Sequence, residues 1–231
     1  MESFHYTRGF IQHSTSVKRK LSAGFTLIEL LVVVAIIGAL SSVVISGQGN
    51  FNKSLLLTNV AYDLALTLRS VQTYGLGSRV VGATSGSQNA GHGMQFLASS
   101  PTTFAQFVDL YPAVPTSSNP ETRPGNKLYD SPTELVMTHT LQNSVTVKNF
   151  CAQSSGIWAC AYPSGSVGTG TLTALDIVFS RPNSDPAIRI NSNEALSATE
   201  ACITLTSPQG GDSFISVTPA GQIHTKATTC P

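Results

Sequence analysis

The chain has 231 residues, of which 41% are hydrophobic and only 11% are charged, and its formal net charge is +1. This length allows one domain with a hydrophobic core and an additional element. So weakly charged a chain gives no reason to expect electrostatic nucleic-acid binding or a polyacidic partner. The charge is uneven, because residues 1–24 carry +3 while the remainder holds nine Lys or Arg against eleven Asp or Glu. This asymmetry predicts an N-terminal targeting signal.

A long apolar run follows the basic residues Lys18, Arg19 and Lys20. The run covers 25–45, about 21 residues or ~31 Å as a helix, which matches a hydrocarbon core of ~30 Å. A segment that is apolar on every face favours lipid over a buried core helix. No A-x-A-like signal cleavage site follows it. We therefore expect a retained transmembrane helix with the N-terminus in the cytoplasm and the rest of the chain across the membrane.

Helical periodicity continues beyond the apolar run. Apolar residues recur at steps of three and four and form one stripe, which contains Leu57, Val60, Ala61, Leu64, Leu68 and Val71. No proline occurs between residues 25 and 100, so nothing forces a break before Gly75 and Gly77. We interpret these glycines as a helix C-terminal signal rather than a dinucleotide-binding loop. The prediction is one helix over 25–75, transmembrane at 25–46, whose amphipathic half at 50–75 is shared with a head.

The composition changes after residue 76, where Ser, Thr, Gly, Asn and Pro become frequent. Short alternating or β-branched runs in this region predict strands. Their ranges are 93–98, 103–110, 134–140, 144–148, 172–180, 187–190, 202–206, 213–217 and 222–225. Turn-rich separators between the last three predict an antiparallel meander, and we expect loops at 82–92 and 112–132. The expected fold class is α+β, with a long N-terminal helix packed on an antiparallel β-sheet head at 76–231.

Four cysteines lie in the second half of the chain, at Cys151, Cys160, Cys202 and Cys230. None forms a C-x-x-C pair and no His stands at ligand spacing, so we expect no metal site. An even number of cysteines outside the membrane usually forms disulfides. We favour Cys151–Cys160 and Cys202–Cys230, because each pair joins sequence neighbours, and four buried free thiols are the alternative. Trp158 lies inside the first loop, either as a surface contact or buried against it.

No sequence pattern indicates catalysis. The five histidines are scattered, and H-E-x-x-H, G-x-S-x-G and Walker A patterns do not occur. We therefore expect no catalytic residue, no enzyme activity and no cofactor.

The segment from Lys20 to Val33 closely resembles the N-terminal motif of type IV pilins and pseudopilins. A basic leader ends in Gly24, an aromatic residue follows at Phe25, and Glu29 is fifth after the expected cut. The resemblance implies that prepilin peptidase removes the leader 1–24 by cutting between Gly24 and Phe25, and that it then methylates the new amine of Phe25. It also implies a lollipop-shaped protein whose helix is half embedded in the head.

Parts of the predicted head resemble the H-type minor pseudopilins of type II secretion systems and related minor pilins. The similar segments are 93–96, 107–109 and 215–223. The long Pro- and Ser-rich insert 112–133 and the Cys151–Cys160 loop depart from that pattern. The resemblance therefore leaves the system open between a pilus, a secretion system and a competence-type filament, and between a major and a minor subunit.

Glu29 is the one charged residue inside the apolar run. A charge at the centre of a membrane helix costs about 2.5 to 3.5 kcal/mol on insertion scales, so such residues usually have partners and functions. One interpretation places Glu29 near the interface, where it reaches lipid headgroups. The other pairs it with the amine freed at Phe25, four residues away on the same helical face. In the resembled family the pairing matters most between subunits, with Ala35, Gly38 and Ala39 allowing close helix approach.

The resemblance also implies partners and a location. The expected partners are prepilin peptidase, other pilin or pseudopilin subunits in a helical filament, an inner-membrane assembly platform and the lipid bilayer, while nucleic acid stays open. The expected location is the cytoplasmic membrane, with one span and an extracytoplasmic head, and then a surface or periplasmic filament. The alternatives are a tip adhesin or DNA-binding minor pilin, and a signal-anchored surface enzyme with a catalytic group in the head.

Overall fold

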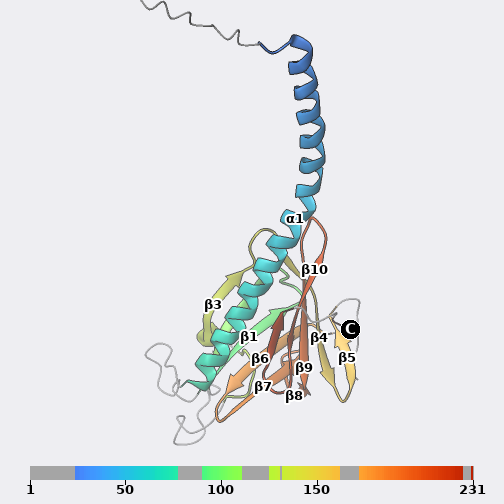
Figure 1. The fold of residues 1–231 in the computed structure, drawn as a ribbon. Coiled ribbons are helices and arrows are strands. Elements are labelled where there is room, and N and C mark those ends of the chain that lie inside the picture. The colour runs from blue at the N-terminus through green and yellow to red at the C-terminus, as the bar shows by residue number, and fades with distance from the viewer. Residues whose placement is uncertain are drawn as a thin grey trace, which may run out of the picture. The chain divides into compact units, whose positions relative to one another are not determined.

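A computed structural model describes residues 24–77, 90–110, 125–130, 132–161, 172–225 and 230, and describes the backbone alone for 46–54. The chain divides into two compact units, residues 1–47 and residues 48–231, which are described separately. We call the second of these the head unit. The predicted long helix is present as α1, which runs from Leu27 to Leu76 and begins in the first unit (Figure 1).

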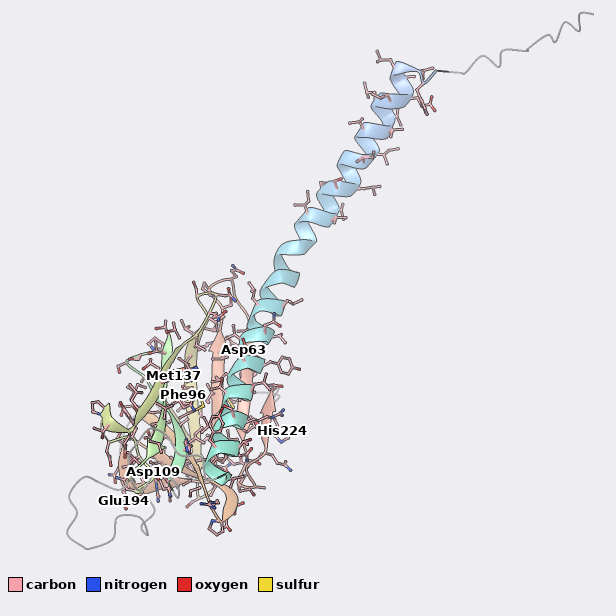
Figure 2. All side chains as sticks on the ribbon, turned by 90° about the vertical axis from the view of Figure 1, so that its left-hand side faces the viewer. Asp63, Phe96, Asp109, Met137, Glu194 and His224 are labelled. Carbon is pink, nitrogen blue, oxygen red and sulfur yellow. A yellow bond between two sulfur atoms is a disulfide. The ribbon has the colours of Figure 1, made fainter. Side chains whose placement is uncertain are left out.

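The described part of the first unit is the first half of α1. Among the described residues, the stretch Leu27–Ile45 is the one helical segment long and apolar enough to cross a membrane, and none of it is buried. Side chains project from every side of this half of the helix (Figure 2). Such a surface is compatible with lipid or with other apolar helices, and is unfavourable in water.

The described part of the head unit contains two antiparallel sheets and the second half of α1 (Figure 1). One sheet has six strands in the order β3-β2-β1-β6-β7-β8. These strands are β1 (Gly91–Leu97), β2 (Thr103–Asp109), β3 (Leu135–Thr140), β6 (Ala174–Ser180), β7 (Asn183–Ile190) and β8 (Asn193–Ala198). The second sheet has five strands in the order β11-β10-β9-β4-β5. These are β4 (Thr146–Ser154), β5 (Ile157–Cys160), β9 (Glu200–Thr206), β10 (Asp212–Val217) and β11 (Ile223–Thr225). A short 3-10 helix, η3 (Pro132–Glu134), precedes β3.

One hydrophobic core joins α1 to both sheets. Every residue of the predicted helical stripe is buried, from Leu57 at 4% exposure to Val71 at 0%. The stripe packs against apolar side chains of the six-stranded sheet, such as Phe96 and Ile177, and of the five-stranded sheet, such as Ile203. The helix therefore covers the sheets through the face that its 3.6-residue period defines. The α+β fold class and the C-terminal meander β9-β10-β11 are confirmed.

Several strand predictions need correction. The expected loop 82–92 overlaps β1, which begins at Gly91. The strand expected at 144–148 is longer, because β4 continues to Ser154. Glu134 belongs to η3 and not to the following strand. Two strands were not predicted, β5 and β8, and β7 begins at Asn183 rather than at residue 187.

The role expected for Gly75 also needs correction. Gly75 lies inside α1, and the helix ends one residue later, where Gly77 N–H donates to the Tyr74 carbonyl at 3.3 Å. A Cβ atom built on Gly75 would collide with the backbone oxygen of Phe179 in β6. Gly75 is therefore needed because the helix backbone approaches the sheet backbone closely here, and not as a C-cap.

Candidate assembly site

The start of α1 is organised by Thr26 and Glu29. The backbone N–H of Glu29 donates to Thr26 Oγ1 at 3.2 Å, and the N–H of Leu30 donates to the Thr26 carbonyl at 3.2 Å. Thr26 therefore serves as the N-cap, and Glu29 stands three residues later, in the T-x-x-E arrangement of a capping box. Its negative charge also suits the positive end of the helix dipole.

Sequence reasoning missed this cap, although the Thr26-to-Glu29 spacing was a readable signal for it. The cap fixes the first turn of the helix and so determines where the Glu29 carboxylate is presented. Because Phe25 immediately precedes the N-cap, an amine created there would stand at the start of the same helix. The structure thus places the three residues of the predicted processing and assembly site, Gly24, Phe25 and Glu29, together at one helix end.

The surface around this helix end is unprotected in the single chain. Phe25 and Leu27 are each 82% exposed, and Glu29 is also exposed. Further along, a Cβ atom built on Gly38 would meet no other group within 4 Å. The small-residue set that includes Gly38 therefore leaves a place where another helix backbone can approach closely.

Residues 19–45 match the family model described as the prokaryotic N-terminal methylation motif. The matched segment contains Gly24, Phe25 and Glu29 together with the first half of α1. This match supports the resemblance of the N-terminal segment to that of type IV pilin-like proteins. No curated protein and no solved structure matches the chain, so the resemblance of head segments to H-type minor pseudopilins is not shown.

The head unit contains two disulfides, in the pairings that sequence proximity favoured. Cys151 in β4 is bonded to Cys160 in β5, and these residues are direct partners in the strand register. Cys202 in β9 is bonded to Cys230, which closes a loop with a sequence separation of 28. Trp158 in β5 is half-buried. Disulfides of this kind suit an extracytoplasmic head.

Sequence reasoning also missed a buried acidic cluster in the head unit. Asp109 at the end of β2 is fully buried (Figure 2). It accepts two hydrogen bonds from Lys127, one from the backbone N–H and one from Nζ, both at 3.1 Å. Burial raises the pKa of Asp109, although the neighbouring Lys127 ammonium acts in the opposite direction. The pair attaches the segment 125–130 to the end of β2.

Two further carboxyl groups lie in the same region. Glu134 accepts from Leu110 N–H at 3.1 Å and from Asp130 N–H at 2.8 Å, and burial raises its pKa to about 7. Asp176 in β6 accepts from Gln95 Nε2 at 2.9 Å through Oδ1, and burial raises its pKa to about 7 as well. Its second oxygen, Oδ2, is buried without a hydrogen-bond partner.

These contacts give the acids a structural explanation. They accept backbone and side-chain hydrogen bonds that tie the segment around Lys127 and Glu134 to the sheet. No group of three or more His, Cys, Asp or Glu residues in the described part of the chain is arranged to hold a metal ion. Asp109 and Asp176 differ from surface acids only because a segment distant in sequence buries them. No local sequence pattern indicates this burial.

Proposed function

We propose that this chain is a structural subunit of a type IV pilus-like or pseudopilus-like filament, cut between Gly24 and Phe25 and assembled through the N-terminal half of α1. Prepilin peptidase, an inner-membrane assembly platform and neighbouring pilin-type subunits are its partners. The protein first resides in the cytoplasmic membrane with its head unit outside, and it then leaves the bilayer for the filament.

One observation carries the proposal. The methylation motif at 19–45 contains the helical segment Leu27–Ile45, whose side chains are all exposed in the single chain, while one face of the continuation of the same helix is buried in the head unit. The side chains of the apolar segment are thus left exposed in the described chain. Lipid before assembly and neighbouring helices after it supply the apolar surroundings that this surface requires.

Glu29 supplies the selectivity that apolar packing lacks. Lipid tails and leucine side chains are similarly apolar, so burial alone does not favour a helix neighbour over lipid. A carboxylate in that setting does favour a neighbour that carries an amine. Cleavage before Phe25 creates this amine. A processed chain can therefore pair its Glu29 carboxylate with the amine of one neighbour and its own Phe25 amine with the carboxylate of another.

The test compares the parent protein with Glu29→Leu and Glu29→Asp. Three quantities are measured: the membrane-bound fraction, the intact mass of the extracted protein, and the amount in sheared filaments. The parent and both variants should lose residues 1–24 and gain one methyl group, because the cleavage site is unchanged. Glu29→Leu should insert at least as well as the parent yet be strongly depleted from filaments, and Glu29→Asp should retain part of the assembly.

Each readout has its own contradicting result. A parent protein that keeps its original N-terminus, or that is cut beyond Ile45, would contradict processing between Gly24 and Phe25. A parent that is processed but never enters filaments would contradict the proposed function. Equal incorporation of Glu29→Leu and the parent would contradict the role of Glu29 and leave assembly to helix packing and head contacts.

A further inference from the structure

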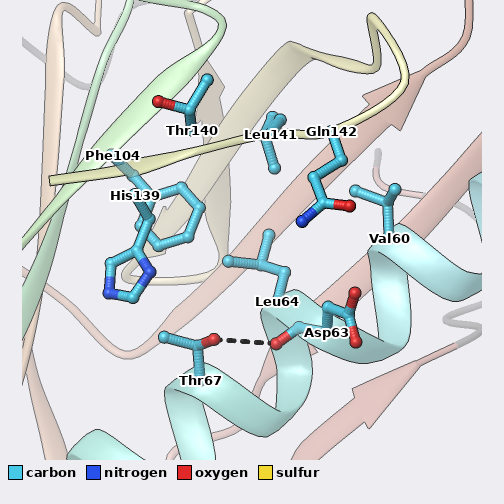
Figure 3. Close-up of a pocket in the computed structure, with 9 residues that line it drawn as sticks. All are labelled: Val60, Asp63, Leu64, Thr67, Phe104, His139, Thr140, Leu141 and Gln142. Carbon is cyan, nitrogen blue, oxygen red and sulfur yellow. Dashed lines mark hydrogen bonds between the residues drawn. The ribbon is translucent and has the colours of Figure 1, made fainter.

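A pocket lies between the second half of α1 and the β2–β3 edge of the six-stranded sheet (Figure 3). Its volume is about 130 Å³. An apolar cavity of about 150 Å³ in another protein holds one benzene molecule, so this pocket is large enough for one side chain. The lining residues are Val60, Asp63, Leu64, Thr67, Phe104, His139, Thr140, Leu141 and Gln142.

The lining combines an apolar floor with a polar opening. The floor consists of the buried side chains of Val60, Leu64, Phe104 and Leu141. Figure 3 shows the Asp63 carboxylate and the Gln142 amide on one side of the opening, and the His139 ring over Phe104 on the other. A side chain that enters this pocket therefore meets hydrocarbon along its length and a carboxylate near its end.

Asp63 supplies the one carboxylate among the residues that line the pocket. Burial lowers the pKa of His139 from 6.5, so its ring is neutral at pH 7. The ring stacks on Phe104 at 4.9 Å, and its Nε2 is 3.0 Å from Gln106 Oε1, which holds it in place. The ion pairs among the described residues are Lys127–Asp109 and Lys148–Asp212. Asp63 is exposed and takes part in neither of these ion pairs.

Most of the exposed large apolar side chains of the head unit lie on α1 and β3, two of the elements that border this pocket. Seven large hydrophobic residues are exposed in the described part of the unit, and five of them lie on α1 or β3. Those five are Leu55, Tyr62, Leu66, Leu135 and Met137. Leu66 is three residues from Asp63 on the helix surface, and Met137 shares a strand face with His139. By this spacing Leu66 and Met137 are the exposed apolar residues next to the pocket, and exposed apolar surface beside a pocket is typical of a protein-binding site.

We propose that this surface receives the head of a neighbouring filament subunit, and that a lysine of the neighbour inserts into the pocket and pairs with Asp63. The inference rests on the proposed function, and it adds a specific head contact to the helix packing described above. A lysine matches the pocket because its four-carbon stem covers the apolar floor while its compact ammonium reaches the carboxylate. A small metabolite could fill the pocket, but it would leave the adjacent apolar side chains of Leu66 and Met137 in water.

The first experiment measures assembly of full-length Asp63→Asn and Asp63→Lys. The matched control is Asp185→Asn, which neutralises another exposed acid, in β7, that takes part in neither ion pair. Membrane insertion, cleavage and both disulfides should be unchanged in all variants. Sheared-filament content should fall about tenfold for Asp63→Asn, the loss expected when one partner of a partly desolvated charge pair is removed. It should fall further for Asp63→Lys and match the parent for Asp185→Asn.

The second experiment identifies the partner. Carbodiimide treatment of intact parent filaments should couple the Asp63 carboxylate to a lysine amine of a neighbouring subunit, with loss of water, and Asp63→Asn should remove this cross-link. Normal assembly of Asp63→Asn, or filaments without an Asp63–lysine cross-link, would overturn the inference. Either result, with a parent that still assembles, would leave the proposed function standing. A parent that does not enter filaments would defeat the proposed function itself.

Discussion

Replacing Asp176 with Asn should stabilise the head unit more at pH 8 than at pH 5. Asp176 is fully buried, and its Oδ2 atom has no hydrogen-bond partner. The substitution keeps the shape of the side chain and the acceptor for Gln95 Nε2. It removes a negative charge that burial and the neighbouring acids Asp109 and Asp130 all disfavour. The expected effect is therefore the removal of an electrostatic penalty, because burial outweighs the hydrogen bonds from Gln95 and Tyr129 that favour the charged carboxylate.

The pH dependence follows from the direction of the pKa shift. The folded-state pKa of Asp176 is raised from 3.8 to about 7. A raised pKa means that folding takes up a proton between these values, so the parent loses stability as pH rises and the loss is complete once pH passes about 7. Between pH 5 and pH 7 the loss is about 3 kcal/mol at 1.36 kcal/mol per pH unit. The advantage of Asn should grow by the same amount between pH 5 and pH 8.

The assay is denaturant unfolding of the full-length protein in detergent at both pH values. Trp158 is the single tryptophan and lies in β5, so its fluorescence reports on the head unit. Asp185→Asn is the control. Because Asp185 is exposed, this substitution should change the unfolding free energy by the same amount at both pH values. A change in unfolding free energy that is equal at pH 5 and pH 8 for Asp176→Asn would refute the reasoning, since it would mean that the carboxyl group is ionised throughout.

Two further predictions concern backbone packing and covalent links. Gly75→Ala should lower the unfolding free energy of the head unit by about 1–3 kcal/mol, because the added Cβ would collide with the Phe179 backbone oxygen. The control is Gly38→Ala on the same helix, where the added Cβ meets nothing, and it should leave the unfolding free energy of the head unit unchanged. Equal effects of the two substitutions would contradict the close approach of the helix to β6. Cys202→Ala with Cys230→Ala should cost about 3.5 kcal/mol in the chain-entropy model, against about 2.5 kcal/mol for loss of the shorter loop. Unfolding of the two double variants measures both costs, and a reversed order would show that loop length does not govern them.

The helix was predictable because its signal is local. The stripe from Leu57 to Val71 repeats at helical spacing, and every member is buried where the period requires. The end of the helix was predicted within a residue or two for the same reason. The function of Gly75 was not predictable, because it depends on where β6 lies, and β6 is about a hundred residues further along the chain.

The two missed strands each follow a two-residue turn. Ser155 and Gly156 join β4 to β5, and Asn191 and Ser192 join β7 to β8, all with positive φ. Paired positive φ values are typical of the tightest hairpin turns, which favour Asn and Gly. The dipeptides Ser-Gly and Asn-Ser therefore indicate two-residue hairpin turns. A prediction based on longer turn-rich separators misses such short turns. The strand predicted at 187–190 begins just after Pro186, whereas β7 includes this proline, which is tolerated here beside a register irregularity.

The division into two sheets was beyond local reasoning. Each strand can be recognised by its own alternation, but its partner is fixed by the packing of the whole unit. β3 and β4 are consecutive in sequence but belong to different sheets. β1 pairs with β6, although the β4–β5 hairpin of the other sheet lies between them in sequence. The acidic cluster depends on the same non-local packing, since Asp109 and Asp176 become buried only when strands and a covering segment meet.

The processing and assembly site illustrates the opposite case, in which a few adjacent residues carry most of the information. In the proposed filament, the apolar side chains between Leu27 and Ile45 exchange lipid for neighbouring helices, and the free energies of these two surroundings nearly cancel. The direction and register of assembly must then come from polar groups that distinguish a neighbour from lipid. Glu29 with the Phe25 amine provides one such group at the membrane, and Asp63 provides another on the head unit. This reasoning places the strongest assembly phenotypes at these few polar side chains, and it expects conservative apolar exchanges along the first half of α1 to be tolerated.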